Sequence, residues 1–201
     1  EALKIKDQDN SEVIVISMGP PSAENNLREL IAMGADSAIL LTDRPFAGAD
    51  TWATSKTLSS AISKIGDVDL ILTGKQAIDG DTAQVGPGIA EFLKLPQAMF
   101  VRKIVQCDES DITVQRSTET GYEELAIKLP CVLSIVKGKT DPRLPSLRGK
   151  MKAKKAEITK WTITDLELDP DSVGLSGSPT RVMKIFSPPH KEGGEILEGD
   201  A

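Results

Sequence analysis

The stretch at residues 69–92 constrains the fold of this chain more than any other. Its first part, residues 70–73, is short, apolar and rich in branched side chains, and therefore predicts a buried strand. A polar, glycine-punctuated loop follows and leads into a helix that ends near residue 94. Because the first amides of a helix are unpaired and positively polarised, such a loop favours an anion such as phosphate. Glycine, aspartate and threonine also occur in such loops only to cap a helix, so the loop alone leaves both interpretations open.

The start of this helix can be placed in two ways. Asp81 and Gln84 have the spacing of a capping box. Pro87 would then lie inside the helix and remove a hydrogen bond, so the regular helix is expected to begin nearer Ala83. The later start leaves more loop amides free for a ligand.

Length and composition exclude several classes of protein. The 201 residues, 39% of them hydrophobic, suffice for one main domain with an appendage. A net charge of −6 argues against a globally basic nucleic-acid binder. Two cysteines, Cys107 and Cys131, and one histidine, His190, leave no disulfide framework, catalytic triad or metal centre. Without a signal peptide or an apolar run of roughly 20 residues, the expected location is the cytoplasm.

Strands predicted at residues 13–17, 38–41 and 70–73 alternate with helical patterns in the first half of the chain. This alternation predicts right-handed βαβ units, that is, a Rossmann-like α/β fold with a parallel sheet and helices on both faces. The loops that follow these three strands would then share one sheet edge, where open α/β sheets bind ligands.

The pattern changes after Pro96. Residues 99–105, 112–116, 124–129 and 131–136 read as strands that pair without long helices. From Asp165 onward the chain is acidic and proline-rich, with one short predicted strand at residues 182–186. We expect a nucleotide- or flavin-binding domain at residues 1–160 and an extended arm at residues 161–201, which needs another surface to lie on.

Residues 137–155 carry eight basic side chains against one acidic one. Residues 147–156 can form a short, exposed helix. A solvated surface, a docking surface for an acidic protein or ligand, and a nucleic-acid site all remain open. The absence of interleaved aromatic residues weakens the last. The basic residues are Lys137, Lys139, Arg143, Arg148, Lys150, Lys152, Lys154 and Lys155.

Several motifs occur together along nearly the whole chain. They are Ser17-Met18-Gly19-Pro20, residues 32–36, Gly74-Lys75-Gln76-Ala77-Ile78-Asp79, residues 129–133, residues 151–155, and Val114-x-Arg116-x-x-Glu119 followed by Glu123-x-Leu125 and Pro130. In this order the set resembles the β (small) subunit of electron-transfer flavoproteins, with Thr120 where the family usually has a small or acidic residue. Compared with that family, the sequence is expected to be trimmed at both ends, with the family's first strand and its nucleotide-contacting loop upstream of Glu1 and the family's final helix downstream of Ala201.

The resemblance implies an adenine-nucleotide α-hydrolase-like fold and a heterodimer with a larger α subunit. Ordinary members hold AMP in the β subunit and FAD mainly in the α subunit. The cofactor contacts carried over, with the small second loop that could lie against a flavin ring, are Met18, Gly48, Asp50, Thr51, Gly74, Lys75, Gln76, Ala77, Ile78, Asp79, Gly80, Asp81, Thr82, Ala83, Gln84 and Val85.

One departure resembles the electron-bifurcating branch of the family. Ordinary members tend to have Asn-Gln-Thr where this chain has Ala83-Gln84-Val85. In the bifurcating branch FAD replaces AMP. It takes a hydride from NADH and sends one electron to ferredoxin or flavodoxin and the other through the α subunit to an acyl-CoA-type or other flavin dehydrogenase. Small residues at these positions could equally serve tight packing.

The resemblance also gives the basic helix a role. Leu147 corresponds to the apolar anchor on which a partner dehydrogenase docks, and the cations after it would steer an acidic partner. The expected docking residues are Leu147, Arg148, Lys150, Met151, Lys152, Lys154 and Lys155.

No residue is expected to act as a general acid, base, nucleophile or metal ligand, because the flavin carries the chemistry. Two alternatives stay open. One is a non-bifurcating β subunit that holds a structural AMP, and the other is a stand-alone adenine-nucleotide-binding module.

Overall fold

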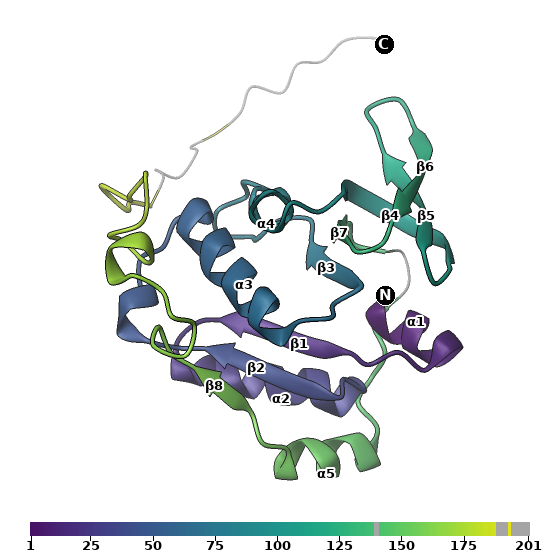
Figure 1. Cartoon of the computed structure of the whole chain (residues 1–201), viewed down its shortest axis with the longest axis horizontal. Helices are drawn as coiled ribbons and strands as arrows, with labels where there is room; N and C mark the ends of the chain where they lie inside the picture. Colours follow the sequence, from purple (N-terminus) through teal and green to yellow (C-terminus); the bar gives the residue numbers. More distant parts are fainter. Residues whose placement is uncertain (139–140, 188–192, 194–201) are drawn as a thin grey trace.

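Strand β2 (Ser37–Leu41) is the middle strand of the first of two sheets in the computed structural model, which describes residues 1–138, 141–187 and 193 (Figure 1). It pairs in parallel with β1 (Ile14–Met18) on one side and β8 (Thr159–Trp161) on the other. Successive side chains of a strand point to opposite faces, so β2 contributes to two separate clusters. Leu40 packs with α2 and α5 on one face, and Leu41 packs with α3 on the other.

The helices cover both faces of this sheet (Figure 1). Helix α2 packs against α5 below the sheet, while α3 packs against α4 above it. The α-helices are α1 (Ala2–Asp9), α2 (Glu24–Met33), α3 (Thr51–Ile65), α4 (Val85–Leu93) and α5 (Leu147–Lys155), and the short 3-10 turns are η1 (Pro21–Ala23), η2 (Arg44–Phe46) and η3 (Pro170–Ser172).

The second sheet has the strand order β3-β7-β4-β5-β6. Strand β7 pairs in parallel with β3 and with the start of β4, while β4, β5 and β6 form an antiparallel meander. Helix α4 packs over one face through Ile89, Ala90 and Val132. The strands are β3 (Leu70–Gly74), β4 (Gln97–Cys107), β5 (Asp111–Ser117), β6 (Tyr122–Lys128) and β7 (Cys131–Ile135).

These elements confirm the predicted Rossmann-like α/β class and the change to strand pairing after Pro96. The parallel strands nevertheless fall into two sheets. Within the described ranges, β1 pairs only with β2, and β3 only with β7. The sequence pattern specifies strands and their direction, but it does not specify which strand edges meet.

The capping box predicted at Asp81 and Gln84 is wrong. Helix α4 begins at Val85, with Gln84 at the N-cap and no side-chain capping bond, and the Gln76 amide contacts Asp81 instead. Pro87 is the third residue of the helix, where a backbone donor has no intrahelical partner to lose. The later start therefore holds, two residues beyond Ala83.

The chain after residue 160 is not uniformly extended. Leu166 and Val173 are buried in the cluster that contains Phe46 and Leu41, so the first part of the predicted arm packs on the body of the protein. Residues 181–187 have no regular structure, and the strand predicted at residues 182–186 is wrong. Lys139, Pro188, Pro189 and His190 lie outside the described residues.

Among the helices that the structure describes, none is long and apolar enough to cross a bilayer.

Candidate functional site

The loop after β2 is organised by two aspartates. Asp43 caps η2 by accepting a 2.7 Å hydrogen bond from the Arg44 amide, and the Phe46 side chain that follows is buried. The chain then turns at Gly48, whose φ of +74° is in the left-handed region that favours glycine. Asp50 ends the loop as the N-cap of α3.

The N-termini of α3 and α4 lie side by side. The Thr51 hydroxyl donates a 2.8 Å hydrogen bond to Gln84 Oε1, and Ser55 Oγ lies 3.3 Å from the Val85 carbonyl oxygen. A Cβ at Gly88 would lie 2.4 Å from Ser55 Oγ, so the helices approach closely only because residue 88 is glycine. This packing brings the predicted contacts of the second loop next to the end of the loop at residues 74–84.

The loop at residues 74–84 starts where β3 ends and is open to solvent. The Lys75 amide donates a 2.9 Å hydrogen bond to the Ile135 carbonyl, and the Asp81 amide donates one of 3.0 Å to Ala77. Beyond these two bonds, the amides at positions 76–80 and 82–84 donate to no group in the part of the chain that is described. Asp81 and Ala83 have φ values of 51° and 55°, and Ile78 is fully exposed.

Free amides of this kind fit the phosphates of an adenine nucleotide. The first amides of α4, at Val85 and Gly86, follow this loop directly and lie at the N-terminal end of the helix, where the helix dipole is positive. No metal or nucleophilic side chain is needed for such binding, since oriented backbone N–H groups suffice.

Met18 lies at the carboxyl end of β1, opposite Leu41 of β2, and packs against the cluster that holds Phe46. The structure therefore places this predicted contact beside the second loop. The three predicted contact regions all lie beyond the carboxyl ends of parallel strands. Met18 is the last residue of β1, the loop at residues 47–51 follows β2 and η2, and the loop at residues 74–85 begins where β3 ends.

Both carboxylate oxygens of Asp50 are already hydrogen-bonded. Oδ1 accepts from the amides of Trp52 and Ala53 at 3.0 and 3.1 Å, and Oδ2 accepts from the amide and hydroxyl of Thr180 at 2.9 and 2.8 Å. Burial alone would raise the pKa of Asp50, but these hydrogen bonds outweigh it and hold the pKa below the ordinary value of an aspartate. Asp50 therefore holds the shape of the loop by accepting hydrogen bonds from other residues of the same chain.

Phe100 is a neighbour of the site that the sequence analysis missed. Its φ of 62° is unusual for an aromatic residue, and it lies where the pairing of β4 with β7 is interrupted between Ala98 and Val101. The Phe100 amide donates a 2.9 Å hydrogen bond to the buried Ser134 hydroxyl, and the Lys75 ammonium lies 5.7 Å from the ring centroid. Nothing in residues 99–105 signals a bulge, because neither glycine nor proline interrupts the run.

Helix α5 carries the predicted docking residues and is fixed at both ends. The Ser146 hydroxyl caps it by accepting from the Gly149 amide at 3.0 Å. Arg28 of α2 donates to the carbonyl oxygens of Ala153 and Ala156 at 2.7 and 2.9 Å. Leu147 and Met151 are 78% and 58% exposed, so both apolar side chains are presented to solvent.

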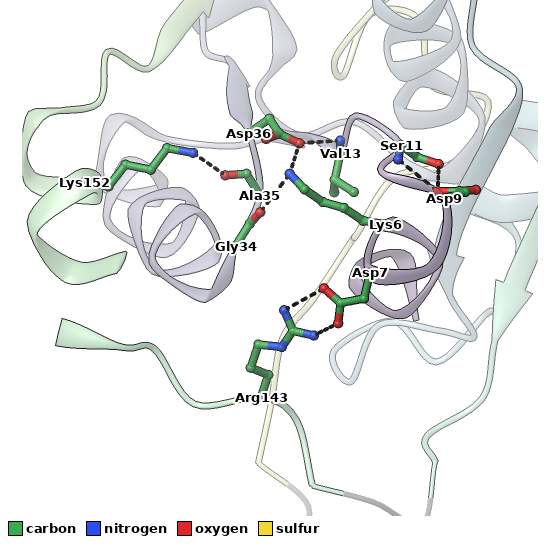
Figure 2. Close-up of polar contacts among 10 residues, drawn as sticks. All are labelled: Lys6, Asp7, Asp9, Ser11, Val13, Gly34, Ala35, Asp36, Arg143 and Lys152. Carbon is green, nitrogen blue, oxygen red and sulfur yellow. Dashed lines mark hydrogen bonds and ion pairs between the residues drawn. The ribbon is translucent and has the colours of Figure 1, made fainter. Parts of the chain in front are cut away.

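Polar contacts tie α5 and the segment before it to α1 and to the residues that follow α2 (Figure 2). Lys152 donates to the Ala35 carbonyl at 3.3 Å, and Arg143 forms an ion pair with Asp7 of α1. Asp36 accepts from the Val13 amide at 2.8 Å and contacts Lys6. A cavity of about 610 Å³ beside α5 is lined by cations and by the C-terminal end of α2.

Replacing Asp50 with alanine is expected to lower the free energy of unfolding at pH 7 by about 1 kcal/mol, because α3 loses its cap. The pKa of Asp50 is depressed in the folded state, so its carboxylate stabilises the fold above the unfolded pKa. That contribution disappears as the pH falls through the folded value. Urea unfolding of both proteins from pH 7 to pH 3 should show the difference shrinking, with Asp50→Ser as the uncharged capping control. A pH-independent difference would contradict this account.

Comparisons with known proteins show the family to which the chain belongs. Residues 1–166 match the electron transfer flavoprotein domain family. The chain is 52% identical over 199 residues to the caffeyl-CoA reductase-Etf complex subunit CarD of Acetobacterium woodii, covering 98% of this chain and 76% of that protein. It is 49% identical over 201 residues to the electron transfer flavoprotein subunit beta of Thermoanaerobacterium thermosaccharolyticum, covering 100% and 76%.

A third relative, the acryloyl-CoA reductase electron transfer subunit gamma of Anaerotignum propionicum, is 42% identical over 206 residues, covering 99% of this chain and 77% of that protein. These matches extend over both candidate loops and α5. The chain therefore belongs to the electron-transfer flavoprotein family, as one of its beta (small) subunits.

Proposed function

We propose that this beta subunit binds FAD between its two loops and takes part in electron bifurcation from NADH. The carrying observation is the open loop at residues 74–84, which has unpaired backbone amides and is joined at Gln84 to the N-terminus of α3 by the hydrogen bond from Thr51. A diphosphate has two anionic groups to satisfy, and a run of free backbone donors suits it.

The side chains at the end of this loop support FAD over AMP. Ala83 and Val85 present no polar group beside the helix N-terminus, which leaves room for a longer diphosphate on the backbone amides. The Thr51–Gln84 hydrogen bond would hold the two loops at a fixed separation around the ligand.

When bound, FAD would supply the hydride and electron chemistry, and the protein would bind and orient it. The chain's own contribution is positional. Met18 and the second loop would line one side, and Lys75 would place a cation at the other. No proton transfer by a side chain is assigned.

The proposed partners follow from the proposed role in electron bifurcation. We propose a heterodimer with the α subunit that passes electrons to ferredoxin or flavodoxin and to a flavin dehydrogenase of acyl-CoA type, in the cytoplasm. Two relatives are named as parts of CoA-thioester reductase systems, one for caffeyl-CoA and one for acryloyl-CoA. These names support a dehydrogenase partner that acts on a CoA thioester.

The ligand of the beta site decides between FAD and AMP. We expect denaturation of the purified αβ heterodimer to release two FAD per heterodimer, measured by visible flavin absorption and by chromatography of the released nucleotides. One FAD and one AMP would overturn bifurcation and leave a structural nucleotide in the beta subunit. The absence of any adenine nucleotide from the beta subunit would overturn the site itself.

We further propose that α5 docks the dehydrogenase. Its exposed Leu147 and Met151 offer apolar contact, and Lys154 and Lys155 add positive charge at its C-terminal end. Charge of this kind raises the rate of encounter with an acidic partner, while the apolar anchor sets the lifetime of the complex.

Two variants separate these effects in electron transfer from the heterodimer to its dehydrogenase. Leu147→Ser should lower the second-order rate constant at least tenfold at every salt concentration. The double variant Lys154→Glu/Lys155→Glu should lower it mainly at low ionic strength and flatten its salt dependence, because screening removes steering. Lys103→Glu, an exposed charge on β4, is the matched control. Equal effects of all three variants would contradict docking at α5.

A further inference from the structure

Asp50 joins the second cofactor loop to a distant part of the chain. One carboxylate oxygen caps α3, and the other accepts two hydrogen bonds from Thr180. The Asp50 amide in turn donates a 2.8 Å hydrogen bond to Ser178 Oγ, which donates to the Gly174 carbonyl at 2.6 Å. The same residue therefore fixes the start of α3 and residues 174–180, which we call the strap.

The strap lies tightly on the second loop. The Leu175 amide donates a 3.0 Å hydrogen bond to the Ala47 carbonyl, and the Leu175 side chain lies against Gly48. A Cβ at Gly174 would lie 1.8 Å from the Pro45 carbonyl oxygen, so no other residue fits without moving the loop. Any rearrangement of the loop at residues 45–50 must therefore be transmitted to the strap.

The strap leads directly into residues 181–187, which we call the docking segment. Its four large apolar side chains are strongly exposed, between 71% and 89%. Chains in water rarely leave such a cluster uncovered, so it marks an interaction surface. The four side chains are Val182, Met183, Ile185 and Phe186.

The chemistry of this surface fits the larger subunit of the proposed flavoprotein heterodimer. Permanent subunit interfaces are more hydrophobic than transient ones, and the docking segment has apolar residues at four of seven positions. Helix α5, in contrast, combines one or two apolar side chains with many cations, which suits a transient encounter. The two surfaces thus differ in the chemistry of the partner they fit.

We propose that nucleotide binding at the second loop and association with the larger subunit are coupled through the contact between Asp50 and Thr180. A nucleotide that orders residues 47–51 also orders the strap, which positions the docking segment for the partner. By linkage, the partner must then tighten nucleotide binding by the same factor. This inference rests on the proposed function, because it assumes that the second loop contacts the nucleotide.

The coupling is measured as the dissociation constant of the α–β heterodimer with and without saturating FAD, using an α subunit that already holds its own FAD and a beta subunit stripped of nucleotide, and again with AMP. For the natural sequence we expect FAD to tighten association at least fivefold, the lower end of typical coupling factors. Thr180→Val removes the hydroxyl that bonds Asp50 at 2.8 Å but keeps the amide bond of 2.9 Å, and should therefore reduce the FAD effect without abolishing it. Thr180→Ser keeps the hydroxyl and should restore it.

The controls separate this inference from the proposed function. Thr118→Val, an exposed threonine at the β5–β6 turn, should leave the coupling as in the natural sequence. FAD binding to the free beta subunit, followed by flavin fluorescence, should change less than twofold in Thr180→Val. If FAD does not bind at all, the proposed function fails. If FAD binds but association is unaffected by either nucleotide, or if Thr180→Val keeps full coupling, the inference is overturned.

Discussion

The close approach of α3 and α4 is the constraint on which the site depends. Gly88 lets the backbone of α4 reach Ser55 of α3, and the Thr51–Gln84 hydrogen bond joins the two N-termini. Both loops that precede these helices are therefore held side by side, although each follows a strand of a different sheet. A larger residue at position 88 would separate the helix ends and, with them, the amides proposed to bind the nucleotide.

Much of the fold could be predicted because burial repeats along the chain. Alternating apolar strands and amphipathic helices gave the α/β class, and the loss of helical spacing after Pro96 gave the meander. Strand β8 was not predicted because it has only three residues, two of them polar and exposed. It is defined by pairing with β2 rather than by its own sequence pattern. The strand predicted at residues 182–186 is wrong for the opposite reason, because its sequence pattern suits a strand but it pairs with no strand that the structure describes. Its apolar side chains have no described surface to pack on.

The site was predictable at the level of loops but not of contacts. Glycines and a following helix mark an anion-binding loop in sequence, and resemblance extended that to named residues. The links from Asp50 to Ser178 and Thr180 span about 130 positions and involve common polar residues, so no local pattern identifies them. The same holds for the Arg28 hydrogen bonds that fix α5, since they pair one side chain with distant carbonyl groups.

The central claim is that the two loops together bind an adenine dinucleotide, and amide hydrogen exchange tests it most directly. When FAD is added to the nucleotide-stripped heterodimer, we expect slower exchange at residues 76–86 and 47–53, with unchanged rates in the β5–β6 hairpin. Protection of both loops in the same FAD concentration range would support a shared site. Protection confined to other residues, or exchange in both loops that FAD leaves unchanged, would contradict the account.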